Sequence, residues 1–250
     1  MTEIAIKVEN LSKNFKVYQE KSTSIFEFLI GRFVRGKSHH THEVLKNINF
    51  TLNKGEMLGI VGFNGMGKTT LLRILSKIYQ PTSGSVTLNG KVIPFLELSS
   101  GFQPEMTAKE NIILYGVLLG IDKAEMLRKI DKILEFAELE KYSNVKIKHF
   151  SSGMYGRLAF STAIQVDPDI IMIDEVLAVG DILFQQKSYD AYMNFKKVGK
   201  TIVLVTHSIN EIEKLCDKAL LIHEGRSQVY GKPNEVIKEY IKLAEKRKNN

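Results

Sequence analysis

Cysteine is nearly absent from this sequence, and that absence narrows the class of protein. The single residue of this type, Cys216, excludes an intramolecular disulfide framework and a cysteine-based zinc site, and fits a reducing compartment. Long apolar runs are also missing, because the longest, residues 112–121, is too short for a bilayer core that needs about 20 apolar residues. The N-terminus lacks the basic start and apolar run of a signal peptide. We therefore expect no segment of this sequence to cross a bilayer.

The composition is that of an ordinary globular protein. At 250 residues, with 44% hydrophobic and 25% charged residues, the chain can form one domain with a sizeable core. Its net charge of +7 is scattered, with the clearest basic clusters at residues 32–42 and 245–248. Because no basic segment is interleaved with aromatic residues, as a nucleic-acid groove would be, we expect no nucleic-acid partner.

The most informative segment is a glycine-rich stretch that fits the phosphate-binding pattern G-x-x-x-x-G-K-[ST] without a mismatch. Its glycines let the backbone turn tightly, so that successive N–H groups can hold phosphate oxygens at the start of a helix. Lys68 adds a charge for the β- and γ-phosphates, and the Thr69 hydroxyl is placed to ligate Mg²⁺. An apolar run precedes the stretch and a helical pattern follows it. We therefore predict a nucleoside triphosphate site at Gly62, Phe63, Asn64, Gly65, Met66, Gly67, Lys68, Thr69 and Thr70.

Two further apolar runs end in polar side chains suited to phosphate chemistry. Residues 170–173 lead into Asp174 and Glu175, and residues 201–205 lead to His207. Buried parallel strands have continuous apolar runs, and the chemistry of open α/β sheets lies at their carboxyl ends. Asp174 suits Mg²⁺, directly or through water, because hard cations prefer carboxylate oxygen. We expect Glu175 to polarise the attacking water and His207 to donate a hydrogen bond to a γ-phosphate.

Residues 150–154, Phe-Ser-Ser-Gly-Met, open a helix-like stretch, and on its own such a turn is a helix cap. The chain as a whole nevertheless resembles the ATP-binding cassette ATPases over nearly its full length, because of the order of its motifs: phosphate loop, Ser-Ser-Gly-Met, Asp-Glu, Ala-Val-Gly-Asp, then His207. The usual signature, Leu-Ser-Gly-Gly-Gln, is altered here at positions 150, 152 and 154. The resemblance implies an α/β fold of the P-loop NTPase type, with an antiparallel β-subdomain and a helical subdomain.

The resemblance also implies a homodimer and a second set of ATP-binding residues. In this family the phosphate loop of one subunit faces the signature of another, so that two copies close head to tail around ATP and Mg²⁺. Asp181 would help to join the two sites. The residues that would contact ATP from across the interface are Ser151, Ser152, Gly153 and Met154.

Two assignments implied by the resemblance stay open. Adenine would stack on an aromatic side chain that precedes the phosphate loop in the sequence. Phe15 is the first candidate and Tyr18 is the second. The family also has a glutamine that senses Mg²⁺ and couples to a membrane partner. Here this residue is Gln103, the only nearby glutamine, or Glu97 takes its position.

Within the family, the altered signature and the sequence at 175–181 resemble the subfamily that exports cell-surface polysaccharides: O-antigens, capsules and teichoic acids. Residues 96–107 and an N-terminal insertion at 19–43 are similar to that subfamily too. The resemblance implies a peripheral protein at the cytoplasmic face of the membrane, working with two copies of a polytopic transmembrane subunit on a lipid-linked polysaccharide. The positive charge would then suit an anionic membrane surface.

The insertion has an apolar pattern of its own. A helix that begins near Ser24 would carry an apolar face formed by Ile25, Phe26, Leu29, Ile30 and Phe33. By resemblance this is a gate helix near the membrane partner; the alternative is a helix that covers the protein's own core.

We expect one domain over residues 1–250, without a carbohydrate-binding extension. Residues 1–90 and 161–222 would form the nucleotide-binding core, 91–160 the helical subdomain, and 223–250 a C-terminal strand and helix. Alternation of apolar and polar residues predicts an antiparallel strand at 4–18, and residues 86–88, which follow the turn-like residues 81–84, suggest another β segment.

Two further segments are predicted to be helical. Residues 109–137 read as helical, with a stripe formed by Met126, Leu127, Ile130, Ile133, Leu134 and Ala137. A last helix beginning at Pro233 would carry Val236, Ile237, Tyr240 and Ile241.

Two other functions compete with export. A cassette ATPase acting on nucleic acid or protein assemblies would need long coiled coils, a second cassette or a basic groove, and the sequence has none of these. A regulatory module that binds nucleotide without turnover would not need the catalytic set, and the chain retains Lys68, Asp174, Glu175 and His207.

Overall fold

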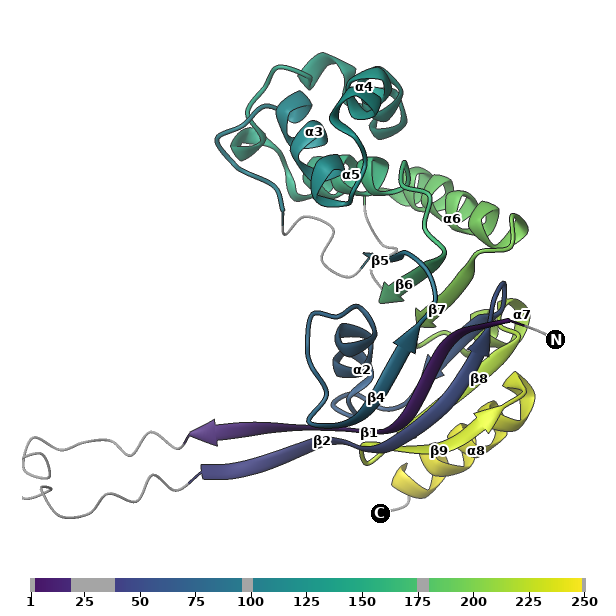
Figure 1. Cartoon of the computed structure of the whole chain (residues 1–250). Coiled ribbons are helices and arrows are strands. Elements are labelled where there is room, and N and C mark those ends of the chain that lie inside the picture. The colour runs from purple at the N-terminus through teal and green to yellow at the C-terminus, as the bar shows by residue number, and fades with distance from the viewer. Residues whose placement is uncertain (1–2, 19–38, 96–100, 175–179, 249–250) are drawn as a thin grey trace, which may run out of the picture.

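The computed structural model describes residues 3–18, 39–95, 101–174 and 180–248 (Figure 1). Most of the predicted insertion at 19–43 lies outside the described residues, and so do Glu97 and Glu175. The backbone of Tyr18 is described but its side chain is not.

A six-stranded sheet of order β5-β6-β7-β3-β8-β9 forms the centre of the molecule. Its first five strands pair in parallel and β9 closes the edge as an antiparallel hairpin with β8. The apolar runs predicted as strands are the adjacent β6, β7 and β3, which are almost wholly buried. In sheet order the strands are Val92–Phe95, Ile170–Asp174, Thr201–Val205, Met57–Val61, Lys218–His223 and Arg226–Gly231.

A second sheet contains three antiparallel strands in the order β2-β1-β4. The strands are β1 Ile4–Tyr18, β2 His39–Asn53 and β4 Ser83–Leu88, so the strand predicted at 4–18 and the β segment predicted at 86–88 are confirmed. The far ends of β1 and β2 project from the molecule as a two-stranded arm (Figure 1). Between the two sheets, Leu71 and Leu72 of helix α2, Lys68–Leu75, join one apolar core with residues of both sheets.

The helical part lies at the end of the molecule opposite the antiparallel sheet (Figure 1). It contains α3 Ala108–Leu118, α4 Lys123–Ala137 and α5 Ser152–Ala163, with short 3-10 turns at Glu140–Tyr142 and Ile147–His149. The predicted α/β fold with an antiparallel sheet and a helical part is confirmed.

The predicted helical region is confirmed, and its apolar stripe is wrong at one residue. Residues 109–137 form two helices, because the chain turns at Gly120, whose φ of 83° is left-handed, and restarts with Asp122 as the N-cap of α4. Leu127 is 51% exposed, because its direction on the helix lies just beyond the buried arc that ends at Leu134. The stretch 91–160 begins with β5, which pairs with β6 in the parallel sheet.

Three more helices follow: α6 Ile182–Lys197, α7 Ile209–Leu215 and α8 Pro233–Lys248. Helix α8 begins at the predicted proline, and Val236 and Ile237 are buried in the core. Ile241 lies on this helix as predicted and is 43% exposed, because four residues after Ile237 it turns beyond the buried arc. Among the residues described, no helix is long and apolar enough to cross a membrane.

Burial makes the one cysteine chemically inert. Cys216 is 8% exposed, and burial raises the pKa of its thiol to about 12, so the thiol stays protonated at neutral pH. Its role is packing.

A close approach between β1 and β4 makes one glycine essential for stability. Gly84 has a φ of 81°, and a Cβ atom there would overlap the backbone carbonyl of Asn10. Left-handed backbone costs an alanine about 1–2 kcal/mol, and the forced displacement adds about 1–3 kcal/mol. We expect Gly84→Ala to lower the free energy of unfolding in urea by the sum of both effects.

Gly199→Ala is the matched control, because Gly199 has a φ of 79° and no described heavy atom lies within 4 Å of an added Cβ. This variant should show only the conformational cost. Equal losses in the two variants would contradict the close approach.

Candidate functional site

The phosphate loop connects β3 to α2, the context that its pattern demands. Gly67 is the N-cap of α2 and is left-handed, with φ 94° and ψ 9°. A Cβ atom there would lie 2.7 Å from Leu45 Cδ2 and 3.1 Å from the Val44 carbonyl oxygen. Both conformation and space therefore require glycine at the turn into the helix.

Lys68 is held inside the curve of the loop. Its side chain is almost fully buried, and its Nζ donates to the carbonyl oxygens of Gly62 at 2.6 Å and Phe63 at 3.1 Å. The ammonium charge is therefore fixed by backbone groups at the first turn of α2, where the helix dipole adds to it.

Four segments meet at a cavity of about 510 Å³: β2, the phosphate loop with α2, the end of β6, and the end of β7 with the residues after it. The loop and α2 supply one wall, and Asp174 at the end of β6 and His207 after β7 supply others. Across it, the Thr69 hydroxyl donates to Asp174 Oδ2 at 3.1 Å. The described lining residues are Val44, Asn64, Gly65, Met66, Gly67, Lys68, Thr69, Thr70, Asp174, Val205 and His207.

The Thr69 and Asp174 oxygens fit a magnesium ion. They are neighbouring hard donors, and Mg²⁺ in nucleotide sites takes one or two protein ligands and completes its shell with phosphate and water oxygens. The described part of the chain contains no group of three or more His, Cys, Asp or Glu side chains that could hold a metal ion by themselves.

Val44 and Val205 also line this cavity, and the motifs of the sequence assign neither of them a role. Val205 could have been found as the last residue of a strand that leads to His207. Val44 could not, because only the path of β2 brings it to the loop, where its carbonyl oxygen also lies near Gly67 and Gly225.

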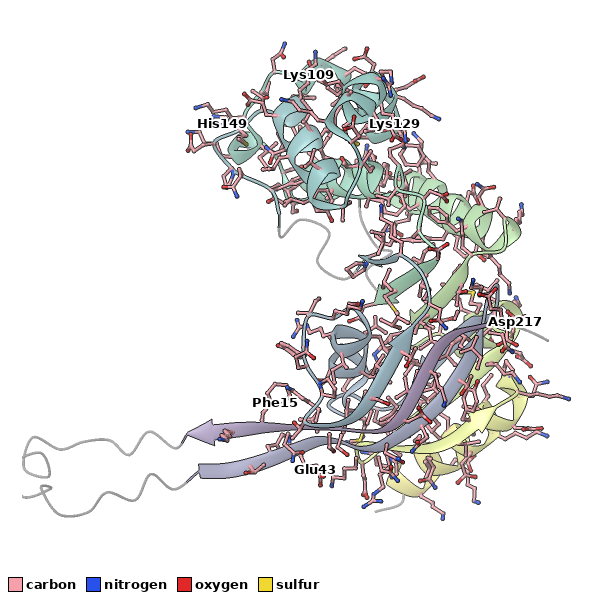
Figure 2. The ribbon with its side chains drawn as sticks, viewed as in Figure 1. Phe15, Glu43, Lys109, Lys129, His149 and Asp217 are labelled. Atoms are coloured by element: carbon pink, nitrogen blue, oxygen red, sulfur yellow. The ribbon has the colours of Figure 1, made fainter. Side chains whose placement is uncertain are left out.

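Phe15 lies on β1, near the loop that follows α2 (Figure 2). Its ring meets Tyr79 edge-on, with centroids 5.6 Å apart, and Lys13 Nζ lies 5.0 Å from its centroid. Phe15 is not among the described residues that line the nucleotide cavity. The stacking of adenine on Phe15 or Tyr18 stays a prediction.

The signature residues lie at a second cavity, of about 600 Å³. Ser151 caps helix α5, because its side chain accepts a hydrogen bond from the Met154 N–H at 3.2 Å. The described lining residues are Glu138, Leu139, Tyr142, Ser151, Ser152, Gly153, Met154, Gly156, Arg157, Gly180 and Asp181. The two cavities share no described lining residue.

Arg157 fixes Asp181 to the signature helix. Its guanidinium reaches Asp181 Oδ2 at 2.6 Å and Glu138 Oε2 at 2.7 Å, and lies 5.0 Å from the Phe184 ring centroid. The pKa of the Asp181 carboxyl lies below its usual range. The hydrogen bond from the Phe184 N–H lowers it most, and the positive charge of Arg157 lowers it further. No sequence motif assigns a role to Arg157; its place one turn after Gly153 is the only signal.

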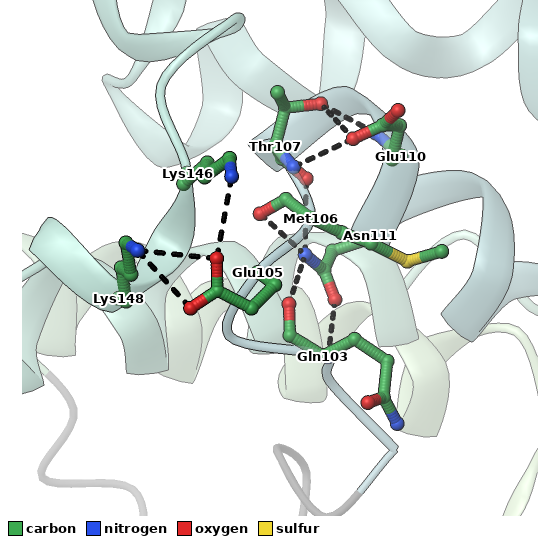
Figure 3. A network of polar contacts seen from close by, with 8 residues as sticks. All are labelled: Gln103, Glu105, Met106, Thr107, Glu110, Asn111, Lys146 and Lys148. Carbon is green, nitrogen blue, oxygen red and sulfur yellow. Dashed lines mark hydrogen bonds and ion pairs between the residues drawn. The ribbon is translucent and has the colours of Figure 1, made fainter.

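Gln103 belongs to a polar network at the start of the helical part (Figure 3). Asn111, which is fully buried, accepts from the Gln103 N–H at 2.7 Å and donates to the Gln103 carbonyl at 3.0 Å. The Gln103 side chain points away from this network (Figure 3), and among described residues it does not line the nucleotide cavity. Its role, and that of Glu97, stay predictions.

The same network reaches the segment that leads into the signature. Glu105 accepts from Lys148 at 3.0 Å and from Lys146 at 3.2 Å, and these two lysines, Lys148 first, lower the pKa of its carboxyl (Figure 3). The sequence offered no hint of Asn111 or of this ion pair.

The comparisons with known proteins agree with this geometry. The ABC transporter family matches residues 45–178. The O-antigen export system ATP-binding protein of Myxococcus xanthus is 43% identical over 96% of this chain and 57% of its own length, so the chain spans little more than half of that relative. The protein of the same name from Klebsiella pneumoniae is 37% identical, over 95% of this chain and 98% of its own.

A teichoic acids export ATP-binding protein of Bacillus anthracis is 36% identical over 96% of this chain and 43% of its own length. Among solved structures, a dimeric post-hydrolysis ATP-binding cassette bound to ADP and Pi has the same fold, with a TM-score of 0.70, 24% identity, and coverage of 91% of this chain and 98% of that one. The chain therefore belongs to the ABC transporter family, among its ATP-binding proteins.

Proposed function

We propose that this chain is the ATP-hydrolysing subunit that powers export of a lipid-linked cell-surface polysaccharide, similar to an O-antigen, through a separate transmembrane subunit. The observation that carries the ATPase part is the single cavity at which the phosphate loop, Asp174 and His207 converge. The export part rests on the relatives named for O-antigen export, which match nearly the whole of this chain.

Each of the polar residues at the cavity would have a different role in phosphoryl transfer. Lys68 would neutralise the β- and γ-phosphates, while Thr69 and Asp174 would hold Mg²⁺, which supplies further positive charge to the transferred group. His207 would donate to the γ-phosphate, and Glu175, the residue after Asp174, would orient and deprotonate the attacking water.

Separation of the two cavities supports a head-to-tail homodimer. Because the phosphate loop and the signature line different cavities, each ATP would need the loop of one copy and Ser151 and Gly153 of another. Two transmembrane subunits would complete the transporter, which would hold this chain at the cytoplasmic face of the membrane.

Teichoic acid or capsule export is the second candidate. The observation in its favour is the teichoic acids export relative, which is 36% identical to this chain, against 37% and 43% for the O-antigen export proteins of Klebsiella pneumoniae and Myxococcus xanthus. Both candidates use the same ATPase chemistry and differ in the glycan that the transmembrane subunit accepts.

Removal of the proposed base should separate binding from turnover. Glu175→Gln keeps the shape of the side chain but cannot take a proton, so kcat should fall by about 100-fold or more. ATP affinity, measured by calorimetry, should change little. Glu213→Gln, on an exposed position of α7, is the control and should keep wild-type turnover. Near-normal hydrolysis by Glu175→Gln would exclude the assignment.

Mixing two inactive variants tests the head-to-tail arrangement. Lys68→Ala damages the loop side and Gly153→Asp the signature side, so a heterodimer of the two keeps one intact site. We expect ATPase activity of the mixture above the sum of the separate variants. Lys68→Ala mixed with Asp174→Asn is the control, because both changes damage the same cavity and leave no intact site. Mixed dimers without restored turnover would contradict the arrangement.

Export itself is tested in the cells that produce the protein. Replacement of the chromosomal gene by the Glu175→Gln variant should remove the glycan from the cell surface and leave its lipid-linked form inside, as measured by immunoblotting and lipid extraction. Composition analysis of the retained glycan then distinguishes an O-antigen from a teichoic acid or capsule. Surface glycan that persists in full while ATPase activity is lost would overturn the export proposal.

A further inference from the structure

Helix α8 contacts the phosphate loop directly, although the two are far apart in the sequence. The ring of Phe63, the first residue after Gly62 in the loop, lies against Tyr240 with centroids 5.2 Å apart and planes at 31°. The Arg247 guanidinium lies 5.1 Å from the centroid of the same ring. Tyr240 and Arg247 are two helical turns apart, so one face of α8 covers Phe63.

The hairpin that precedes α8 adds two contacts. His223, at the end of β8, meets the Phe63 ring edge-on with centroids 6.1 Å apart. The Glu224 N–H donates to Met66 Sδ at 3.2 Å. The C-terminal segment thus touches two of the four variable positions of the phosphate-binding pattern.

The first turns of helix α8 are anchored in the core of the protein. Val236 and Ile237, in its first turns, are buried in the main core. Its later residues, Tyr240 and Arg247, reach the loop. At the loop itself, the carbonyl of Phe63 accepts from Lys68 Nζ at 3.1 Å. Direct contacts therefore connect the core, through α8 and Phe63, to the ammonium group of Lys68 in the nucleotide site.

We propose that α8 positions the phosphate loop, with Tyr240 and Arg247 as positioning residues that act through Phe63. Docking of α8 and binding of nucleotide are then coupled, and the coupling is reciprocal: each strengthens the other by the same factor. This inference rests on the proposed binding of ATP at the loop.

The absence of tryptophan from the chain gives a direct test. Tyr240→Trp introduces one fluorescent reporter against Phe63, and Ile241→Trp introduces one on the exposed face of the same helix. We expect ATP with Mg²⁺ to change the emission of the Tyr240→Trp protein, with the midpoint that calorimetry gives for binding. The Ile241→Trp protein should not respond.

Affinity measurements provide the second readout. Arg247→Ala should weaken ATP binding about twofold to fivefold, the range expected when an exposed cation–ring contact is lost. Lys246→Ala removes a neighbouring exposed cation and should have no effect. Tyr240→Ala should raise KM for ATP with little change in kcat, and Tyr240→Phe, which keeps the ring, should restore it.

The possible outcomes separate this inference from the proposed function. If calorimetry shows ATP binding but the Tyr240→Trp emission is constant and Arg247→Ala and Tyr240→Ala bind as the wild type does, the coupling is excluded and the ATPase proposal stands. If no ATP binds to the wild-type protein, both proposals fail. A midpoint shared by fluorescence and calorimetry, with weaker binding only in the variants that face Phe63, supports the coupling.

Discussion

Parallel pairing of β6, β7 and β3 is the constraint on which the nucleotide site depends. The ladder aligns Asp174 with Val205 and Val205 with Ile60, so all three strands end at the same edge of the sheet. The residues that follow them must therefore meet, although they are separated by many positions in the sequence. A slip of β6 by one residue would turn its alternate side chains to the opposite face and separate Asp174 from Thr69.

The signature side depends on a different kind of contact. Arg157 joins Glu138 and Asp181, which are 53% and 61% exposed, so solvent screens these ion pairs and each contributes little to the free energy of folding. The main effect of these ion pairs is to hold neighbouring segments in place. A planar guanidinium that binds both carboxylates and packs on Phe184 fixes the end of α4, the signature helix and the start of α6 relative to one another.

Sequence patterns predicted what is encoded by neighbouring residues. The phosphate loop is a contiguous motif and the central strands are continuous apolar runs, so both were found, together with the strand ends Asp174 and His207. The edge of an apolar face is not set by residue type alone: Leu127 and Ile241 are apolar but lie just outside the buried arcs. Contacts between distant segments gave no local signal, and Arg157 with its two carboxylates is the clearest example. The role of Glu175 rests on the motif alone, because it lies outside the described residues.

The contact between α8 and the loop was hidden for a more specific reason. The phosphate-binding pattern leaves four positions variable, because phosphate recognition there uses the backbone and not the side chains. This chain places Phe63 and Met66 at two of those positions, and both side chains contact the C-terminal segment. Phe63 therefore has two roles through different atoms: its carbonyl holds Lys68 and its ring receives α8. A position that is free for phosphate chemistry is thus available to connect the site to the rest of the fold.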